Sequence, residues 1–195
     1  MKFAKHLIAL AAVAAAVAVP MSAQAESDVT TGPAVGTISA SARLNFRVTV
    51  PKVIYLQVGT GTAFTDVTTV DEVLFSLTAG QVTTPGAVAA SGAGVTARIL
   101  GNGGNVSLTA NGTSGGLANT PMSSTIAWSE ITGTSSSASL PHPAIGNGVA
   151  GAASSLTATA GIVNQTATWT FSYANAATVA AGDYTGQVTY TAALP

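Results

Sequence analysis

The chain has 195 residues and a formal net charge of −1, with 6 lysines and arginines against 7 aspartates and glutamates. This balance offers no electrostatic footprint for nucleic acid or for an anionic membrane surface. Only 7% of the residues are charged, against about 25% in ordinary soluble domains, so an isolated copy has little charge to oppose self-association. Cysteine is absent, which excludes disulfides and thiolate chemistry.

The first 25 residues have the pattern of a secretory signal peptide. Two lysines precede an apolar run over residues 7–19, and Ala23-Gln24-Ala25 has the small-x-small form of a cleavage site. The apolar run is too short to span a bilayer. We therefore predict that the chain is exported and that the mature protein begins at Glu26.

Residues 42–50 alternate between apolar and polar side chains, as in a β-strand with one buried face. The apolar positions are Ala42, Leu44, Phe46, Val48 and Val50. Pro51 has no N–H to donate to a ladder, and a second apolar strand is predicted at residues 53–58. A hairpin needs a loop of at least two residues, so these strands are not expected to pair with each other. Either they are halves of one bent strand that changes sheets, or residues 42–50 belong to another partner.

Short strands separated by glycine-rich turns are predicted along the rest of the chain. They are expected at residues 73–77, 95–100, 106–110, 125–131, 156–160, 169–173 and 184–193. The glycine-rich residues 101–104 predict a hairpin, and residues 181–183 predict the turn of a final strand pair. A long serine- and glycine-rich loop is predicted at residues 132–155. No segment of the mature chain has an apolar stripe at helical spacing, so the pattern predicts an all-β antiparallel sandwich.

The predicted core is rich in aromatic side chains. Those expected to be largely buried are Trp128, Trp169, Phe171 and Tyr190, with Trp169 and Phe171 facing the opposite sheet. Tyr184, just before the last strand, fits two interpretations: a tyrosine corner whose hydroxyl donates to the backbone, or a half-buried strand residue. Both tryptophans lie in predicted alternating strands, which leaves few exposed rings on which a sugar could stack.

The sequence offers no convincing catalytic site. His142, the one histidine of the mature chain, lies between two prolines, where an extended and exposed loop is expected, and no Gly-x-Ser-x-Gly elbow is present. The acidic residues at 66, 71 and 72 match no calcium loop and are expected in a solvated turn. The glycines at 101–104 lack the Lys-Ser/Thr of a phosphate-binding loop. We predict a protein that is not an enzyme and has no cofactor or metal site.

Both ends of the mature chain resemble cysteine-free, pilin-like fimbrial subunits of the alternative, colonisation-factor-type chaperone–usher class. Residues 36–42, the alternating strand, the proline and the sequence VIYLQVGTG at residues 53–61 are similar to the mature amino terminus of these subunits. The sequence AAGDYTGQVTY at residues 180–190 is similar to the end of pilins, where Ala-Gly-x-Tyr-x-Gly precedes the last strand. Residues 117–128 match more loosely.

This resemblance implies an incomplete Ig-like sandwich that is completed by a strand from a neighbouring subunit. On this sequence, residues 26–50 would be the lead-in and the donor strand, Pro51 the hinge, and residues 51–195 the sandwich. The implied partners are copies of the chain or related subunits, a periplasmic chaperone and an outer-membrane usher. The implied location is the periplasm and then a fibre on the surface of a Gram-negative-type bacterium.

Two functions are therefore open from the sequence. The first is an exported structural subunit of an extracellular fimbria-like fibre, assembled by strand addition. The second is a self-contained secreted β-sandwich that binds a glycan or acts as a surface adhesin, with residues 42–50 inserted in its own sheet.

Overall fold

A computed structural model describes residues 26–62 and 64–195. The predicted signal peptide, residues 1–25, lies outside the described residues. The chain divides into two units, Met1–Thr49 and Val50–Pro195. Residues 26–49 are called the arm below, and Val50–Pro195 the body.

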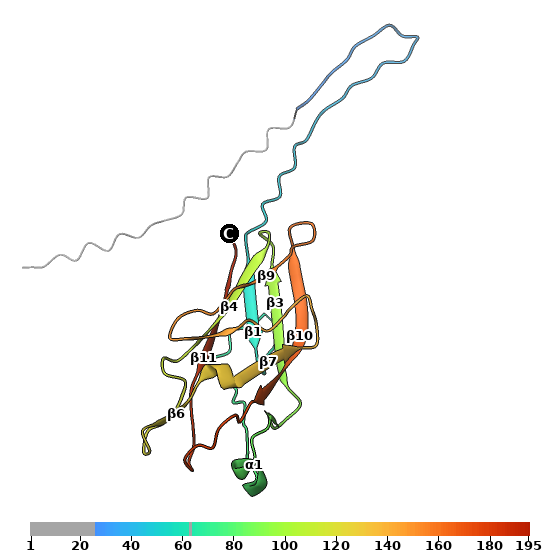
Figure 1. Ribbon diagram of the computed structural model, residues 1–195. Helices are drawn as coiled ribbons and strands as arrows, with labels where there is room; N and C mark the ends of the chain where they lie inside the picture. Colours follow the sequence, from blue (N-terminus) through green and yellow to red (C-terminus); the bar gives the residue numbers. More distant parts are fainter. Residues whose placement is uncertain (1–25, 63) are drawn as a thin grey trace, which may run out of the picture. The chain divides into compact units, whose positions relative to one another are not determined.

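The regular secondary structure of the body is almost all β, as the alternation of its sequence predicted (Figure 1). The strands are β1 Ile54–Val58, β2 Val88–Ala89, β3 Val95–Gly101, β4 Val106–Gly112, β5 Leu117–Asn119, β6 Ser124–Ile126, β7 Ile131–Ser135, β8 Ile145–Asn147, β9 Ser154–Leu156, β10 Val163–Tyr173 and β11 Val188–Ala193. The helices are α1, Ala79–Thr83, and a single 3-10 turn, η1, Trp128–Glu130. The predicted all-β sandwich class is confirmed.

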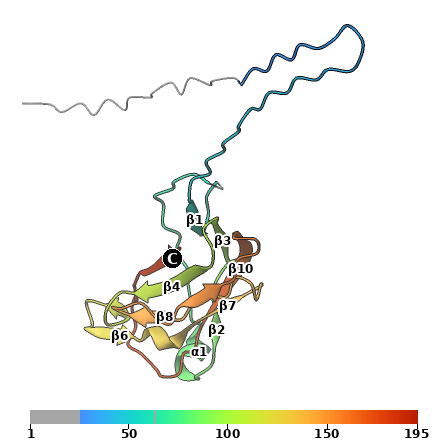
Figure 2. The same ribbon diagram turned by 90° about the horizontal axis from the view of Figure 1, so that it is seen from above.

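Sheet A contains β1, β3, β10 and β2 in that order, with β7 paired to the second half of β10. Every pair in it is antiparallel. Seen from above, β1, β3, β10 and β7 follow one another across the body (Figure 2). Strand β1 therefore forms an edge of this sheet.

Sheet B is centred on β4, which has β11 on one side and both β8 and β9 on the other. The β11 and β9 pairs are antiparallel, whereas β8 runs parallel to β4. Strand β11 therefore forms an edge of sheet B. A separate small hairpin joins β5 and β6.

The two predicted strand pairs are wrong, because their strands lie in different sheets. Strand β3 pairs with β1 and β10 in sheet A, whereas β4 pairs with strands of sheet B. The final strands, β10 and β11, are divided between the sheets in the same way. Both inner faces of β3 and β4 are apolar, so a turn that crosses the sandwich lets these faces bury each other.

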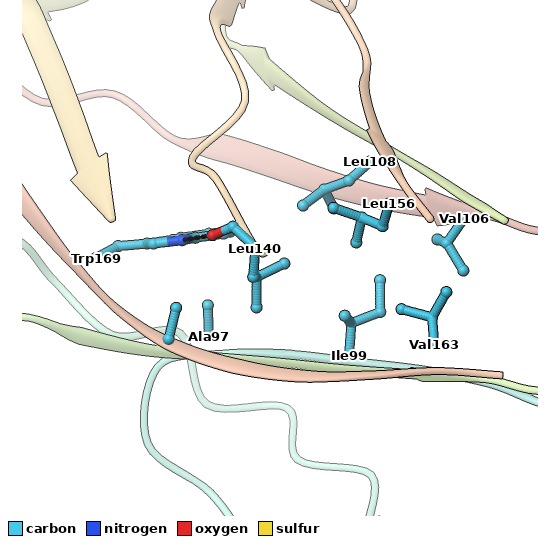
Figure 3. Packing of buried hydrophobic residues seen from close by; sticks show 9 residues of the cluster. Ala97, Ile99, Val106, Leu108, Leu140, Leu156, Val163 and Trp169 are labelled. Atoms are coloured by element: carbon cyan, nitrogen blue, oxygen red, sulfur yellow. Dashed lines mark hydrogen bonds between the residues drawn. The ribbon is translucent and has the colours of Figure 1, made fainter. Parts of the chain in front are cut away.

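The core lies between the two sheets (Figure 3). Ala97, Ile99 and Val163 of sheet A point towards Val106, Leu108 and Leu156 of sheet B, and all of them are buried. Leu140 descends between the layers from the segment after β7, and its carbonyl accepts a hydrogen bond of 3.2 Å from the indole N–H of Trp169. The predicted long loop at residues 132–155 is thus partly wrong, because it contains most of β7, all of β8, the start of β9 and core side chains.

Several element boundaries also differ from the prediction. Residues 73–77 form no strand; the carbonyl of Leu74 accepts a hydrogen bond of 2.8 Å from the Ser91 N–H. The predicted strand at 125–131 is divided among β6, η1 and β7, and β9 ends at residue 156, where a strand was expected to begin. Helix α1 has only 5 residues, too few to show an apolar stripe in the sequence.

Candidate strand-accepting groove and the free arm

Two sheet edges, β1 and β11, lie next to each other on one side of the sandwich. Strand β1 is paired with β3, and β11 with β4; among the described residues neither strand has a partner on its other side. Each edge therefore presents a row of N–H and C=O groups that a further strand can bind.

A groove with a volume of about 590 Å³ opens between these edges. Leu56 and Val58 of β1 line one wall, Val188 and Tyr190 of β11 line the other, and Phe171 of β10 lies between them. Beyond the end of β1, residues 60–62 and 65–75 continue the first wall. The groove is therefore a candidate site for the addition of a strand.

The alternation of β11 explains why one wall of this groove is apolar. Val188, Tyr190 and Ala192 are half-buried, and the threonines between them are exposed. The inward residues of β3 from Ala97 onward and those of β4 are buried, whereas those of β11 remain partly accessible because the layer stops there. Sequence alternation identified the inward face of β11, but only its place in the sheet shows that this face is unfinished.

Phe171 and Tyr190, which line the groove, belong to an aromatic cluster that extends into the sandwich. The imidazole of His142 makes edge contacts with the rings of Trp169 and Phe171, at centroid distances of 4.9 and 5.1 Å. Its Nε2 lies 2.8 Å from the Tyr190 hydroxyl. Burial lowers the pKa of His142 to about 4 and raises that of Tyr190.

The expectation of an exposed His142 is therefore wrong. Pro143, which follows it, is itself buried, so the proline-flanked segment turns inward and fills the sandwich. The signal that sequence reasoning missed is the neighbouring Leu140, an isolated large apolar residue in a serine-rich stretch. His142 is half-buried and packs against the rings that border the core.

The remaining predicted core aromatics are placed as follows. Trp169 is fully buried in β10, and Trp128 is buried on η1, where its indole N–H donates to the Thr113 carbonyl at 2.8 Å. The expectation that Trp128 lies in an alternating strand is thus wrong. Phe171 and Tyr190 are half-buried because they face the open groove.

Tyr184 precedes β11 and is half-buried. Its hydroxyl donates a hydrogen bond of 3.0 Å to the carbonyl of Ala180, a few residues upstream. This contact has the form of a tyrosine corner, and it fixes the approach of the chain to the groove wall.

The acidic turn beside the groove binds its own backbone. The Asp71 carboxylate accepts hydrogen bonds from the Thr60 N–H and hydroxyl, at 2.5 and 2.8 Å, and these bonds lower its pKa. No group of three or more histidine, aspartate or glutamate side chains in the described part of the chain is arranged to hold a metal. Asp71 thus fastens the loop that extends the groove wall.

The alternating segment at residues 42–50 forms no strand in the single chain. Its large apolar side chains are all strongly exposed: Leu44 by 62%, Phe46 by 86%, Val48 by 85% and Val50 by 71%. Ala42 is exposed as well. The period-two pattern predicted a buried face, and the single chain leaves that face in solvent.

Upstream of this segment the arm folds back on itself. The carboxylate of Glu26 accepts hydrogen bonds from Nε and Nη2 of Arg43, at 2.7 and 2.9 Å, and the Thr30 hydroxyl donates to the Ser39 carbonyl at 3.0 Å. Both groups of the Glu26–Arg43 pair are exposed, so this contact is weak in water.

The predicted hinge lies at the start of the body. The side-chain amide of Asn102 donates to the Pro51 carbonyl at 2.8 Å, and its oxygen accepts from the Val53 N–H at 2.7 Å. Lys52 Nζ donates to the carbonyl of Pro195. The residues that follow Pro51 are thus fastened to the turn after β3.

Within residues 26–62 and 64–195, no helix is long and apolar enough to cross a membrane. Comparisons of the chain with protein-family models, with curated proteins and with solved structures found no match.

Proposed function

We propose that this protein is an exported structural subunit of an extracellular fimbria-like fibre. In the fibre, residues 42–50 of one copy form a strand between β1 and β11 of the next copy. The observation that carries this proposal is that one chain has both a groove with apolar residues on its two walls and an exposed segment with an apolar face. The groove is bordered by two sheet edges that are unpaired among the described residues.

The side chains of residues 42–50 supply enough apolar surface for such an insertion. Leu44, Phe46, Val48 and Val50 contribute about 1.5–3 kcal/mol each on burial, or about 6–12 kcal/mol together as an upper estimate. Hydrogen bonds to the two free edges add to this term. Together these terms act against the ordering of the segment and the loss of translational freedom on association.

The length and the polar face of the segment also suit this site. At about 3.3 Å per residue, residues 42–50 span about 26 Å, which covers β1 and the loop that extends its wall. When the apolar side chains face the groove, Arg43 and Arg47 point to the solvent on the opposite face. Neither charge has to be buried.

Glycan binding is less well supported. Trp128 and Trp169 are buried, so neither ring is accessible for stacking on a sugar. The proposal is therefore the fibre subunit. It includes the export that the signal-peptide pattern predicts, and the chaperone and usher that the sequence resemblance implies.

A complementation experiment tests strand exchange directly. Phe46→Asp places a charge on the inserted face, which an apolar groove does not accept. Val188→Arg places a charge on the groove wall and leaves residues 42–50 intact. Arg47→Asp is the matched control, because it introduces the same carboxylate next to Phe46 but on the solvent face.

We expect the wild-type and Arg47→Asp proteins to form polymers, and each of the other variants alone to stay monomeric with a folded body. Mixing the Phe46→Asp and Val188→Arg monomers should give 1:1 dimers, since each supplies the part that the other lacks. Light scattering after size exclusion measures this result. Monomeric wild-type protein at high concentration, or a mixture that forms no dimer, would contradict the proposal.

A further inference from the structure

We propose that Asn102 is a latch that keeps residues 42–50 out of the groove of their own copy and so reserves this strand for a second copy. This inference rests on the proposed function. The proposed function does not say why the groove takes the strand of a neighbour rather than the chain's own strand, since both have the same sequence.

Insertion into the chain's own groove requires a tight reversal. Strand β1, which borders the groove, begins at Ile54, and the apolar segment ends at Val50. The chain must therefore turn back within residues 51–53 before residues 42–50 can lie along β1. A short hairpin of this kind commonly requires a positive φ near its end, and the β-branched Val53 adopts such a conformation only with strain.

Asn102 holds these same residues in the opposite, extended arrangement. Its side chain binds the Pro51 carbonyl at 2.8 Å and the Val53 N–H at 2.7 Å, and its own N–H donates to the Val53 carbonyl at 3.3 Å. Ile54 pairs with Gly101, so these bonds continue the β1–β3 ladder backwards to the hinge. A reversal at residues 51–53 breaks all of them.

The test uses the full mature chain, refolded at low concentration, and a fluorescent synthetic peptide with the sequence of residues 42–50. A monomer with an empty groove binds the peptide, and a monomer that has filled its own groove does not. Asn102→Ala removes both side-chain bonds to the hinge. Asn105→Ala is the matched control: Asn105 lies in the same turn and accepts a hydrogen bond from Ala158, but no hydrogen bond joins its side chain to the hinge.

We expect Asn102→Ala to raise the ratio of monomer that does not bind the peptide to monomer that does by about tenfold. This is the effect of two hydrogen bonds of ordinary strength. The ratio should not depend on protein concentration. Asn105→Ala should leave the ratio at the wild-type value. If Asn102→Ala monomers bind the peptide as wild-type monomers do, the latch is refuted while the fibre proposal stands. If wild-type monomer neither binds the peptide nor polymerises, the proposed function itself fails and the latch falls with it.

Discussion

The Nε2 atom of His142 lies 2.8 Å from the hydroxyl oxygen of Tyr190, and this pair joins the segment after β7 to the groove wall formed by β11. The imidazole is also enclosed by the rings of Trp169 and Phe171. A protonated imidazole at this place would lose most of its hydration.

Acid should therefore destabilise the body through His142. Its pKa is about 4 in the folded state, against 6.5 for an unperturbed histidine, so the unfolded chain binds the additional proton. The free energy of unfolding should fall as the pH drops through 6.5, with the loss complete below about pH 4. The loss should be about 2 kcal/mol once solvent screening of a half-buried ring is allowed for.

Urea unfolding at a series of pH values measures this loss. His142→Gln keeps a polar side chain near Tyr190 but cannot take up the proton, so its stability should decline less over the same range. Carboxylates titrate alike in both proteins, and the difference between the two curves isolates the histidine. Parallel curves would show that His142 is not responsible.

Trp169→Ala should cost about 3–5 kcal/mol of stability, which is a large part of the total for a typical domain. The indole is fully buried and its N–H is bound to the Leu140 carbonyl. Trp169→Phe keeps an apolar ring and should lose less, about 1–3 kcal/mol. Thermal melting of the two variants checks this order; an alanine variant that melts with the wild type would exclude Trp169 from the core.

Gly112→Ala should destabilise the packing of β4 against η1. A Cβ atom at Gly112 would lie 2.3 Å from ring atoms of Trp128, and a buried indole has little room to move, so we expect a loss of about 1–3 kcal/mol. Gly86→Ala is the control, since no atom lies within 4 Å of its added Cβ. Equal melting temperatures for both variants would be inconsistent with a tightly packed Trp128.

The extracellular protein should begin at Glu26. Mass spectrometry of the secreted chain tests this prediction, and Ala25→Arg should block cleavage because signal peptidase requires small residues at its site. Extracellular protein that retains Met1 would contradict it.

The sequence predicted the positions of strands better than it predicted which strands pair with each other. Alternation at Ala97, Ile99, Val106 and Leu108 identified inward faces correctly, because burial of one face leaves a period of two. It does not distinguish a turn within a sheet from a turn that crosses between sheets, since both use glycine and asparagine. The assignment of β3 and β4 to one hairpin failed for this reason.

Some parts of the candidate site could be predicted from the sequence and others could not. The apolar face at Leu44, Phe46, Val48 and Val50 is visible in the sequence, but alternation does not say which copy buries it. The role of His142 was missed because irregular segments have no period, so the burial of Leu140 and Pro143 beside it left no pattern to read. The unpaired edges of β1 and β11 are a property of sheet order, which emerges only when all strands are placed.

The register of β1 against β3 also determines how a fibre of these subunits would carry load. Tension transmitted through residue 50 would enter the body at the start of β1, beside Asn102. Because the groove that holds the neighbour's strand runs beside β1, the force would act along the axis of β1. The ladder from Ile54 to Val58 is then loaded in shear, so its hydrogen bonds must yield together rather than one after another. Such a fibre would resist pulling far better than the modest number of bonds in one short strand suggests.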